Sequence, residues 1–342
     1  MKLLKILILS LIFILIHNIL FGINLKTKKD TTKKEFPGIV FGNIYAGYYY
    51  TINDNYTPKS GFEMSTALLG YTHKISENVK GIIIYDVTRT TNFSYTDTSG
   101  ISNYFEGSKY TAFLKMAQID WKINDVLELN VGQLLNEQYL TLQDKFWAYR
   151  YIAVTFQEMY GFGMLADFGA RIKFNINEKV MYSITAMNGE GIFRHQDDDS
   201  KFLFSGNFEF RPNKNLIIKL YTDYQMPPDD TYEPRMVFSG FVGYKTDKFK
   251  IGAEYNEIFN QGYIRNLNYL GTSLYSAYFI NEKIDILGRF DYIYESAGIE
   301  KGQYYIIGIQ YRPAEKFYTS INTRYNTHLD YTQLYINFGI KF

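Results

Sequence analysis

Residues 331–342 read YTQLYINFGIKF, and large apolar side chains recur at every second position of this stretch. The apolar series is Leu334, Ile336, Phe338 and Ile340. Successive side chains in a β-strand point to opposite faces, so a period of two residues places this series on one face. The stretch therefore predicts a strand that is apolar on one face and polar on the other.

The same alternation continues backward through the second half of the chain, from about residue 200. Charged residues there fall almost entirely in the phase opposite to the large apolar ones: Lys201, Glu209, Arg211, Lys219, Asp223, Lys245, Lys250, Glu254, Asp285, Arg289, Asp291, Arg312, Arg324 and Lys341. Glu257 is the exception, and it lies near a predicted strand end. Such sorting is expected where one face meets lipid, because Lys or Arg there costs about 2 to 4 kcal/mol at the bilayer midplane.

Alternating segments of this kind fill the chain after Pro37. We predict sixteen strands, at residues 38–51, 61–74, 79–90, 108–122, 127–136, 161–174, 179–188, 200–211, 215–226, 235–246, 248–259, 269–281, 284–295, 303–312, 316–326 and 331–342. Their connections alternate between short polar turns and longer loops, the longest at 137–160. Even strand number and alternating connection lengths predict an all-β, 16-stranded antiparallel transmembrane β-barrel, with short periplasmic turns and longer external loops. A soluble β-sandwich is the alternative, but it would not explain the alternation of connection lengths.

Composition narrows the class of protein. The chain has 342 residues, 18% aromatics and a formal charge of +1, which excludes a dedicated nucleic-acid binder because no positive excess is available to neutralise phosphates. Zero cysteines rule out disulfides and leave the redox compartment open. After Pro37 no apolar run reaches the roughly 18 residues that a membrane helix requires.

The N-terminal segment predicts export from the cytoplasm. Residues 1–22 combine Lys2 and Lys5 with an apolar run, which indicates a secretory signal peptide; a retained membrane anchor is the alternative. Residues 23–37 form a charged lead-in, and residues 38–342 the barrel. We expect a bacterial outer-membrane location, with lipid and lipopolysaccharide as surroundings.

Several motifs resemble those of known porins. The last strand closes on Phe342, which resembles the C-terminal signature of bacterial outer-membrane barrels. Val131-Gly132-Gln133, residues 166–170 (ADFGA) and residues 188–191 (NGEG) resemble porins of the phosphate-selective O/P type and their relatives. The resemblance covers about residues 38 to 342 and implies a sixteen-stranded homotrimer whose third loop folds into the pore. No Pro follows the Gly-Gln pair and no arginine ladder is present, which puts phosphate selection in doubt.

The stretch 137–161, EQYLTLQDKFWAYRYIAVTFQEMYG, departs from the alternation. Thr141 and Asp144 resemble a helix capping box, and Trp147, Tyr151 and Val154 recur at helical spacing, which predicts a partly helical loop. Its many aromatics would expose too much apolar surface in water, so we expect the loop to fold inward against the barrel wall.

Inward folding would place charged residues of this loop at a pore constriction. We predict Asp144, Lys145, Arg150 and Glu158 as constriction residues, facing the wall residues Lys219, Asp223, Arg289, Asp291 and Arg324. The competing hypothesis is that the loop charges pair with the wall and only hold the loop in place.

The predicted function is a porin, a water-filled channel for small hydrophilic solutes and ions. Nine basic and five acidic residues among the inward positions favour weak anion preference or none. A sugar- or oxyanion-selective channel is the alternative, and an adhesin or a barrel enzyme would be less consistent with the short loops and scattered histidines. No cofactor or metal is expected, although residues 195–199 (HQDDD) could offer oxygen ligands to a divalent cation.

Overall fold

The computed structural model describes residues 38–52, 58–89, 93–96, 102–105, 110–194, 201–295 and 302–342. The predicted signal peptide and lead-in, and the acidic residues 195–199, lie outside these ranges. Only the unit Pro37–Phe342 is considered below.

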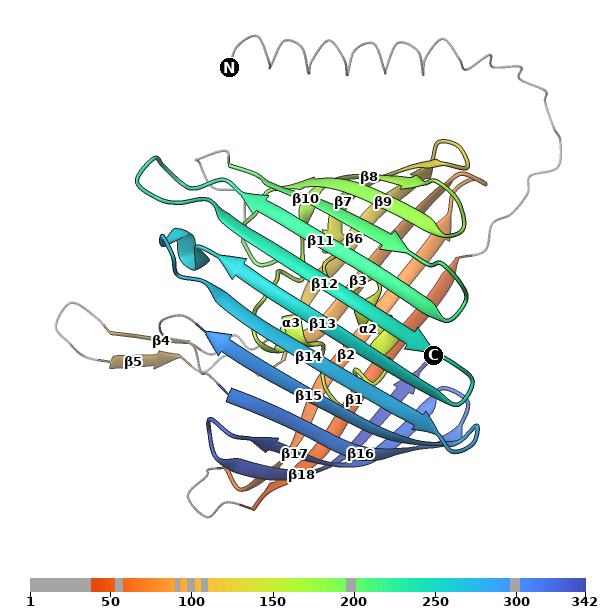
Figure 1. The fold of residues 1–342 in the computed structure, drawn as a ribbon, viewed down its shortest axis with the longest axis vertical. Coiled ribbons are helices and arrows are strands. Elements are labelled where there is room, and N and C mark those ends of the chain that lie inside the picture. The colour runs from red at the N-terminus through yellow and green to blue at the C-terminus, as the bar shows by residue number, and fades with distance from the viewer. Residues whose placement is uncertain are drawn as a thin grey trace, which may run out of the picture. The chain divides into compact units, whose positions relative to one another are not determined.

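Sixteen antiparallel strands form a closed barrel (Figure 1). They are β1 (Ile39–Thr51), β2 (Ser60–Lys74), β3 (Val79–Arg89), β6 (Thr111–Lys122), β7 (Leu127–Leu135), β8 (Ala166–Asn175), β9 (Val180–Met187), β10 (Leu203–Phe210), β11 (Leu216–Gln225), β12 (Arg235–Lys245), β13 (Phe249–Phe259), β14 (Tyr269–Phe279), β15 (Ile284–Glu295), β16 (Gly302–Ala314), β17 (Phe317–Asn326) and β18 (Tyr331–Lys341). The predicted fold class is confirmed. Strand ends agree within three residues, except that β8 begins at Ala166 rather than at residue 161.

The predicted loop 91–107 contains structure that the alternation did not reveal. Two strands of four residues each, β4 (Phe93–Thr96) and β5 (Ser102–Phe105), pair with each other in a separate two-stranded sheet. In the barrel, β3 therefore pairs directly with β6. Strands this short carry too few alternating positions to be distinguished from a loop in the sequence.

The barrel closes between its first and last strands. β1 pairs with β18 from Asn43↔Lys341 to Thr51↔Gln333. Beyond this register, the backbone N–H groups of Gly42 and Phe342 each donate to the carbonyl of the other at 3.0 Å. The C-terminal residue thus takes part in closure, which leaves no free edge strand there.

The face pattern of residues 331–342 is observed as predicted. Ile336 and Phe338 are 41% and 45% exposed on the outer face, whereas Tyr335 and Asn337 are 7% and 2% exposed on the inner face. The predicted exception, Glu257, lies in the outward phase near the end of β13, where it accepts a hydrogen bond of 2.7 Å from the Tyr255 hydroxyl.

Asparagine side chains shape several of the short turns. In four turns, the amide oxygen of one asparagine accepts hydrogen bonds of 2.8 to 3.0 Å from the backbone N–H groups two and three residues ahead: Asn124, Asn177, Asn213 and Asn281. A side chain that mimics a backbone turn in this way explains why such short polar segments reverse the chain.

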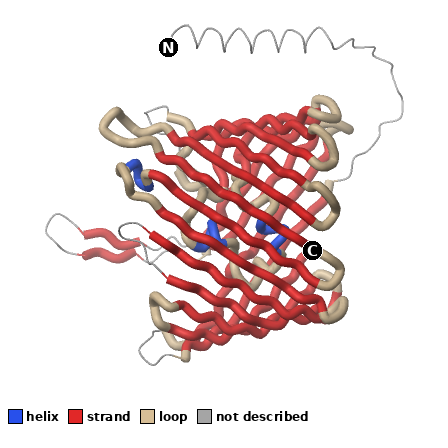
Figure 2. The backbone as a smooth tube through the Cα atoms, viewed as in Figure 1, coloured by secondary structure: helices blue, strands red, loops and turns tan. Residues whose placement is uncertain are grey.

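Within the described ranges, no helix has the length and apolar character needed to cross a membrane. The helical elements of the barrel unit are short: α2 (Gln143–Trp147), α3 (Phe156–Met159) and the 3-10 turn η1 (Gln261–Tyr263). Figure 2 shows α2 and α3 within the outline of the barrel.

Candidate functional site

The connection between β7 and β8, residues 136–165, is named loop 3 below, and its aromatic side chains pack against the inner wall. Phe146, Trp147, Tyr149, Tyr151 and Phe156 are all buried. The loop is not the continuous helix that Trp147, Tyr151 and Val154 suggested. Two short helices, α2 and α3, are separated by residues 148–155. Ala148, with a φ of 63°, ends α2.

The predicted capping box is wrong as well. The residue that caps α2 is Leu142, which makes no side-chain cap, and the Thr141 hydroxyl donates to the carbonyl of Glu137 at 3.4 Å instead. The reason is that contacts with the barrel wall, rather than the intrinsic helical preference of the segment, fix the path of this chain.

The wall beneath loop 3 carries apolar residues in the inward phase, where the alternation predicted polar ones. Phe241, Tyr275, Leu287 and Ile306 are buried in one cluster with the loop residues Phe146, Trp147, Tyr149, Tyr151 and Ile152. The ring centroids of Phe146 and Phe241 lie 5.3 Å apart, and those of Trp147 and Tyr275 lie 5.2 Å apart. This break in the alternation was the sequence signal for the docking surface, and it was missed.

At two wall positions the absence of a side chain on glycine leaves room for an aromatic ring of loop 3. A Cβ atom added to Gly243 would lie 2.7 Å from the Phe146 ring, and one added to Gly271 would lie 2.2 Å from the Phe156 ring. Both distances are shorter than real Cβ contacts. The positions therefore require glycine for the close approach of loop and wall.

Four basic side chains of the wall bind backbone carbonyls of loop 3, and we call them the carbonyl clamp: Lys219, Lys250, Arg289 and Arg324. Lys219 Nζ donates to the carbonyls of Glu137 and Gln138, the latter at 2.9 Å. Lys250 Nζ donates to Phe146 O and Trp147 O at 2.9 and 2.5 Å. Arg324 donates to Ile152 O at 2.5 Å, and Arg289 donates to Val154 O. Charged donors thus satisfy carbonyls that no helix satisfies.

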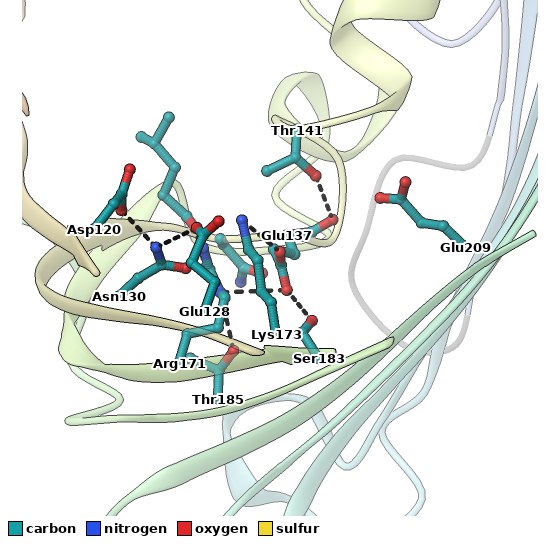
Figure 3. A network of polar contacts seen from close by, with 12 residues as sticks. Asp120, Glu128, Asn130, Glu137, Thr141, Arg171, Lys173, Ser183, Thr185 and Glu209 are labelled. Carbon is teal, nitrogen blue, oxygen red and sulfur yellow. Dashed lines mark hydrogen bonds and ion pairs between the residues drawn. The ribbon is translucent and has the colours of Figure 1, made fainter. Parts of the chain in front are cut away.

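The carboxylate of Glu137 anchors the start of loop 3 to β8 and β9 (Figure 3). Arg171 Nε lies 3.2 Å and Lys173 Nζ 3.7 Å from its oxygens, and the Ser183 hydroxyl donates to it. Burial alone would raise the pKa of this carboxyl, but Arg171, Lys173, Ser183 and Lys219 together outweigh burial and hold the pKa below its ordinary value. Glu137 therefore stays ionised, although it is almost fully buried.

All five predicted wall residues face inward, but loop 3 or its neighbours cover them. Lys219, Asp223, Arg289, Asp291 and Arg324 are buried. Three of them belong to the carbonyl clamp. Asp291 accepts from Arg289 at 2.7 Å and from the Tyr160 hydroxyl at 3.3 Å, and Asp223 accepts from the Tyr221 hydroxyl at 3.0 Å. These side chains thus bond to the loop or to other wall residues.

The four predicted loop residues are more exposed than the docked aromatic side chains: Lys145 is exposed, and Asp144, Arg150 and Glu158 are partly buried on a face that we call the accessible side of loop 3. Arg150 is held between two carboxylates of its own loop, at 2.9 Å from Asp144 and 2.5 Å from Glu158. Burial by itself lowers the pKa of Arg150, but the two carboxylates outweigh burial and raise it above its ordinary value, so the residue stays charged. Lys145 is exposed. The expected facing of Arg150 toward wall charges is not observed, because its partners lie within the loop.

A second group of residues lies on β1, β3 and β6. Tyr45 is buried and packs against Tyr151 of loop 3, with ring centroids 6.3 Å apart. Lys115 Nζ lies 2.8 Å from Asp86, and both side chains are buried. Neither Asp86 nor Lys115 was among the site residues predicted from the sequence.

Two cavities open at the rim of the short turns. The acidic cavity, of about 710 Å³, lies between loop 3 and β7 to β10, and its charged residues are Asp125, Glu128, Glu137, Lys145, Lys173, Glu178, Glu209 and Arg211. The basic cavity, of about 840 Å³, lies under Ala148 and Tyr149 of loop 3, and its charged residues are Lys245, Asp247, Lys248, Lys250, Glu282, Asp285, Arg312 and Lys341. Lys145 of the predicted constriction set thus borders the acidic cavity.

Metal ligation finds no support in the part of the chain that the structure describes. Among those residues, no group of three or more His, Cys, Asp or Glu side chains could hold a metal ion. The candidate oxygen ligands at 195–199 lie outside them.

Several solved structures of outer-membrane proteins and porins share the fold of this barrel. OmpF of Salmonella typhi matches with a TM-score of 0.66 at 9% identity, covering 89% of this chain and 97% of that one. OprB of Pseudomonas putida matches with a TM-score of 0.66 at 10% identity, covering 89% and 94%. OmpT of Vibrio cholerae, solved in a trimer form, matches with a TM-score of 0.60 at 9% identity, covering 90% and 100%. At these identities the likeness shows the fold.

The family model adds sequence evidence to the fold. The family described as "Putative beta-barrel porin-2, OmpL-like" matches residues 160–338, more than half of the chain. The chain belongs to this family of β-barrel porins, and its class is a porin-like outer-membrane channel. No curated protein shows significant sequence similarity to it.

Proposed function

We propose that the chain forms a water-filled pore through which small hydrophilic solutes and ions diffuse passively. The observation that carries this proposal is the two-sided arrangement of loop 3. One side is buried against apolar wall residues and fixed by the carbonyl clamp, whereas the partly exposed Asp144, Arg150 and Glu158 lie on the accessible side and the exposed Lys145 borders the acidic cavity. A fixed loop that carries charge on its accessible side restricts a lumen without closing it.

The constriction in this proposal lies between the accessible side of loop 3 and the wall of β1, β3 and β6. Arg150, Asp144 and Glu158 on the loop are its proposed charged groups, whereas Tyr45, Asp86 and Lys115 on the wall are buried and are neighbours of the constriction rather than lining residues. The clamp residues Lys219, Arg289 and Arg324 act as positioning residues, because their donors are directed at loop carbonyls.

Ion selectivity is expected to be weak, with anion preference or none. The loop presents two cations and two carboxylates, and Asp86 neutralises Lys115 across 2.8 Å. An oxyanion- or sugar-selective channel is the alternative, as in the phosphate-selective porins that the sequence resembles. Membership in a porin family favours either kind of channel over a barrel enzyme or an adhesin.

Reconstitution of the purified protein tests the channel itself. We expect stable single-channel conductance in planar bilayers, and swelling of liposomes in sugars of graded size up to a sharp cut-off. A heat-modifiable shift in gel migration verifies that the sample is folded. Folded protein that neither conducts ions nor admits any sugar would refute the proposal.

Substitution of Arg150 tests the constriction. The Arg150→Ala variant leaves Asp144 and Glu158 without their shared cation, so we expect a shift toward cation selectivity, measured as a reversal potential in a salt gradient. The control is Arg265→Ala, which removes an exposed arginine paired with Glu233 in other loops at 2.5 Å. If Arg150→Ala matched the wild type in conductance and selectivity, Arg150 would only stabilise the loop.

We also infer that a signal peptide is cleaved near residue 22 and that the barrel is surrounded by lipid and lipopolysaccharide.

We further infer that the protein is a homotrimer. The trimer form of the similar OmpT from Vibrio cholerae supports this oligomeric state. The apolar outer faces of β1 and β18, where the barrel closes, are the proposed interface. Native mass spectrometry of detergent-solubilised protein tests the trimer, and a monomeric mass would contradict it.

A further inference from the structure

The basic cavity gathers residues that are far apart in the sequence. Lys245 and Lys248 belong to the turn region between β12 and β13, Arg312 lies near the end of β16, and Lys341 ends β18. These segments meet at one rim of the barrel, where the short turns and the C-terminus lie (Figure 1). Closure of the barrel therefore concentrates positive charge that no single segment carries.

Several of these cations have no internal counter-charge. Among the described residues, Lys245, Lys248 and Lys341 have no carboxylate at ion-pair distance. Asp285 is already engaged: it accepts from Arg312, from Gln310 at 2.7 Å and from the Tyr149 hydroxyl at 3.0 Å. The other two carboxylates, Asp247 and Glu282, are exposed on the turns that edge the cavity. An anion inside the cavity would therefore meet cations without competition from a free buried carboxylate.

One donor within the cavity lacks an acceptor. Arg312 directs its Nη2 group to Asp285, but its Nε atom is buried and has no hydrogen-bond partner among the described residues. Buried donors in folded proteins are almost always paired. A water molecule or an anionic oxygen of a ligand can supply the acceptor for Nε, and the surrounding cations favour the anionic oxygen.

Aromatic rings line the same cavity beside the cations. Lys341 Nζ lies 5.5 Å from the centroid of the Tyr318 ring, and Lys250 Nζ lies 4.2 Å from that of Tyr149. Phe279 extends this apolar surface. A ligand with an apolar body and an oxyanion could contact both kinds of group.

We propose that the basic cavity is a binding site for small organic anions that carry a carboxylate on an aromatic or apolar body. This inference rests on the proposed channel function and names a class of solute for it. The acidic cavity on the same rim lacks this property, because its carboxylates outnumber its cations. The site is thus specific to the side of the barrel formed by β12 to β18.

Calorimetry with benzoate as the probe tests binding directly on the detergent-solubilised, folded protein. We expect benzoate to bind, its affinity to fall as salt is added, and benzylammonium, a cation of similar size, not to bind. The double variant Lys245→Gln/Lys341→Gln should bind benzoate about tenfold more weakly. The control Lys214→Gln removes an exposed lysine from the turn between β10 and β11 on the same rim, outside the cavity, and should bind as the wild type does.

A second measurement connects the site to conduction. Benzoate added on the short-turn side of a planar bilayer should reduce single-channel current in the wild type and in Lys214→Gln, and less so in the double variant. No benzoate binding by the folded wild type, or equal affinity in the double variant and the control, would overturn the inference. Calorimetry requires no conductance, so a barrel that binds benzoate but does not conduct would refute the channel and retain the site.

Discussion

At the residue scale, Glu137 shows how a buried charge can hold a loop. Its carboxylate is shared by Arg171, Lys173 and Ser183, and its backbone carbonyl by Lys219. Removing one member of such a network leaves the others as unpaired buried charges, which costs more than a surface ion pair contributes. Glu137 and its partners therefore act as one unit.

The pKa of Glu137 predicts acid sensitivity of loop 3. Because the folded-state pKa lies below the ordinary value of 4.5, the stabilisation is fully present above that value. It is lost as the pH falls from there through the lowered folded-state pKa. We expect protease cleavage within loop 3, or channel noise, to increase on acidification through this window.

The Glu137→Gln variant is the test of this assignment. It should be less stable than the wild type at neutral pH and should lose most of the acid-dependent change. The exposed turn residue Glu178 offers a control, since Glu178→Gln should retain the wild-type pH profile. An unchanged pH profile in Glu137→Gln would assign the acid response to another group.

At the element scale, loop 3 forms much of the packed hydrophobic core inside the barrel. Its aromatic side chains fill the interior against β11 to β17 in the way that a helix fills the core of a soluble domain. Each fully buried aromatic or aliphatic side chain contributes about 1.5 to 3 kcal/mol relative to exposure. The loop therefore stabilises the barrel as well as narrowing it.

Two phenylalanines of β12 provide a matched test of this docking. Phe241 points inward to Phe146 and is 1% exposed, whereas Phe238 points outward and is 40% exposed. We expect Phe241→Ala to lower the free energy of unfolding by about 3 to 5 kcal/mol and Phe238→Ala by less, measured by denaturant titration in detergent micelles. Equal effects of the two substitutions would contradict a packed interface between loop and wall.

At the scale of the whole molecule, the barrel separates two environments. The outer face presents large apolar side chains and the inner face presents charges that are paired, clamped to loop 3 or gathered in the two cavities. This separation of apolar side chains on the outer face from charged side chains on the inner face predicts that a charge is tolerated on the inner face only.

A charge on the outer face near the middle of β16 should be costly. Ile307 is 64% exposed on that face, and we expect Ile307→Arg to lower stability in lipid vesicles by about 2 to 4 kcal/mol. The control Ile307→Phe keeps the face apolar and should change stability little. Folding yields and unfolding midpoints in vesicles measure both, and a neutral Ile307→Arg would indicate that this surface does not face lipid.

Much of the fold was accessible from the sequence because its signals are local. Alternation over ten residues identifies a strand and its two faces, and Asn-rich turns mark the reversals, so strand number and order follow. The site was accessible only in part. Asp144, Lys145, Arg150 and Glu158 were predicted because an aromatic loop is conspicuous among strands, and their role at a constriction stays a prediction. Asp86, Lys115, Phe241 and Tyr275 were not predicted.

The sequence by itself determined a sixteen-stranded barrel with one charged and one apolar face, because the period of two and the cost of charge in lipid act on every strand separately. Only the tertiary structure decided what the inward charges do. Lys219 and Arg150 are both basic and both inside the barrel, yet one holds loop carbonyls and the other sits between two carboxylates on the accessible side. That difference depends on which strands meet loop 3, a relation between distant segments that closure of the barrel fixes.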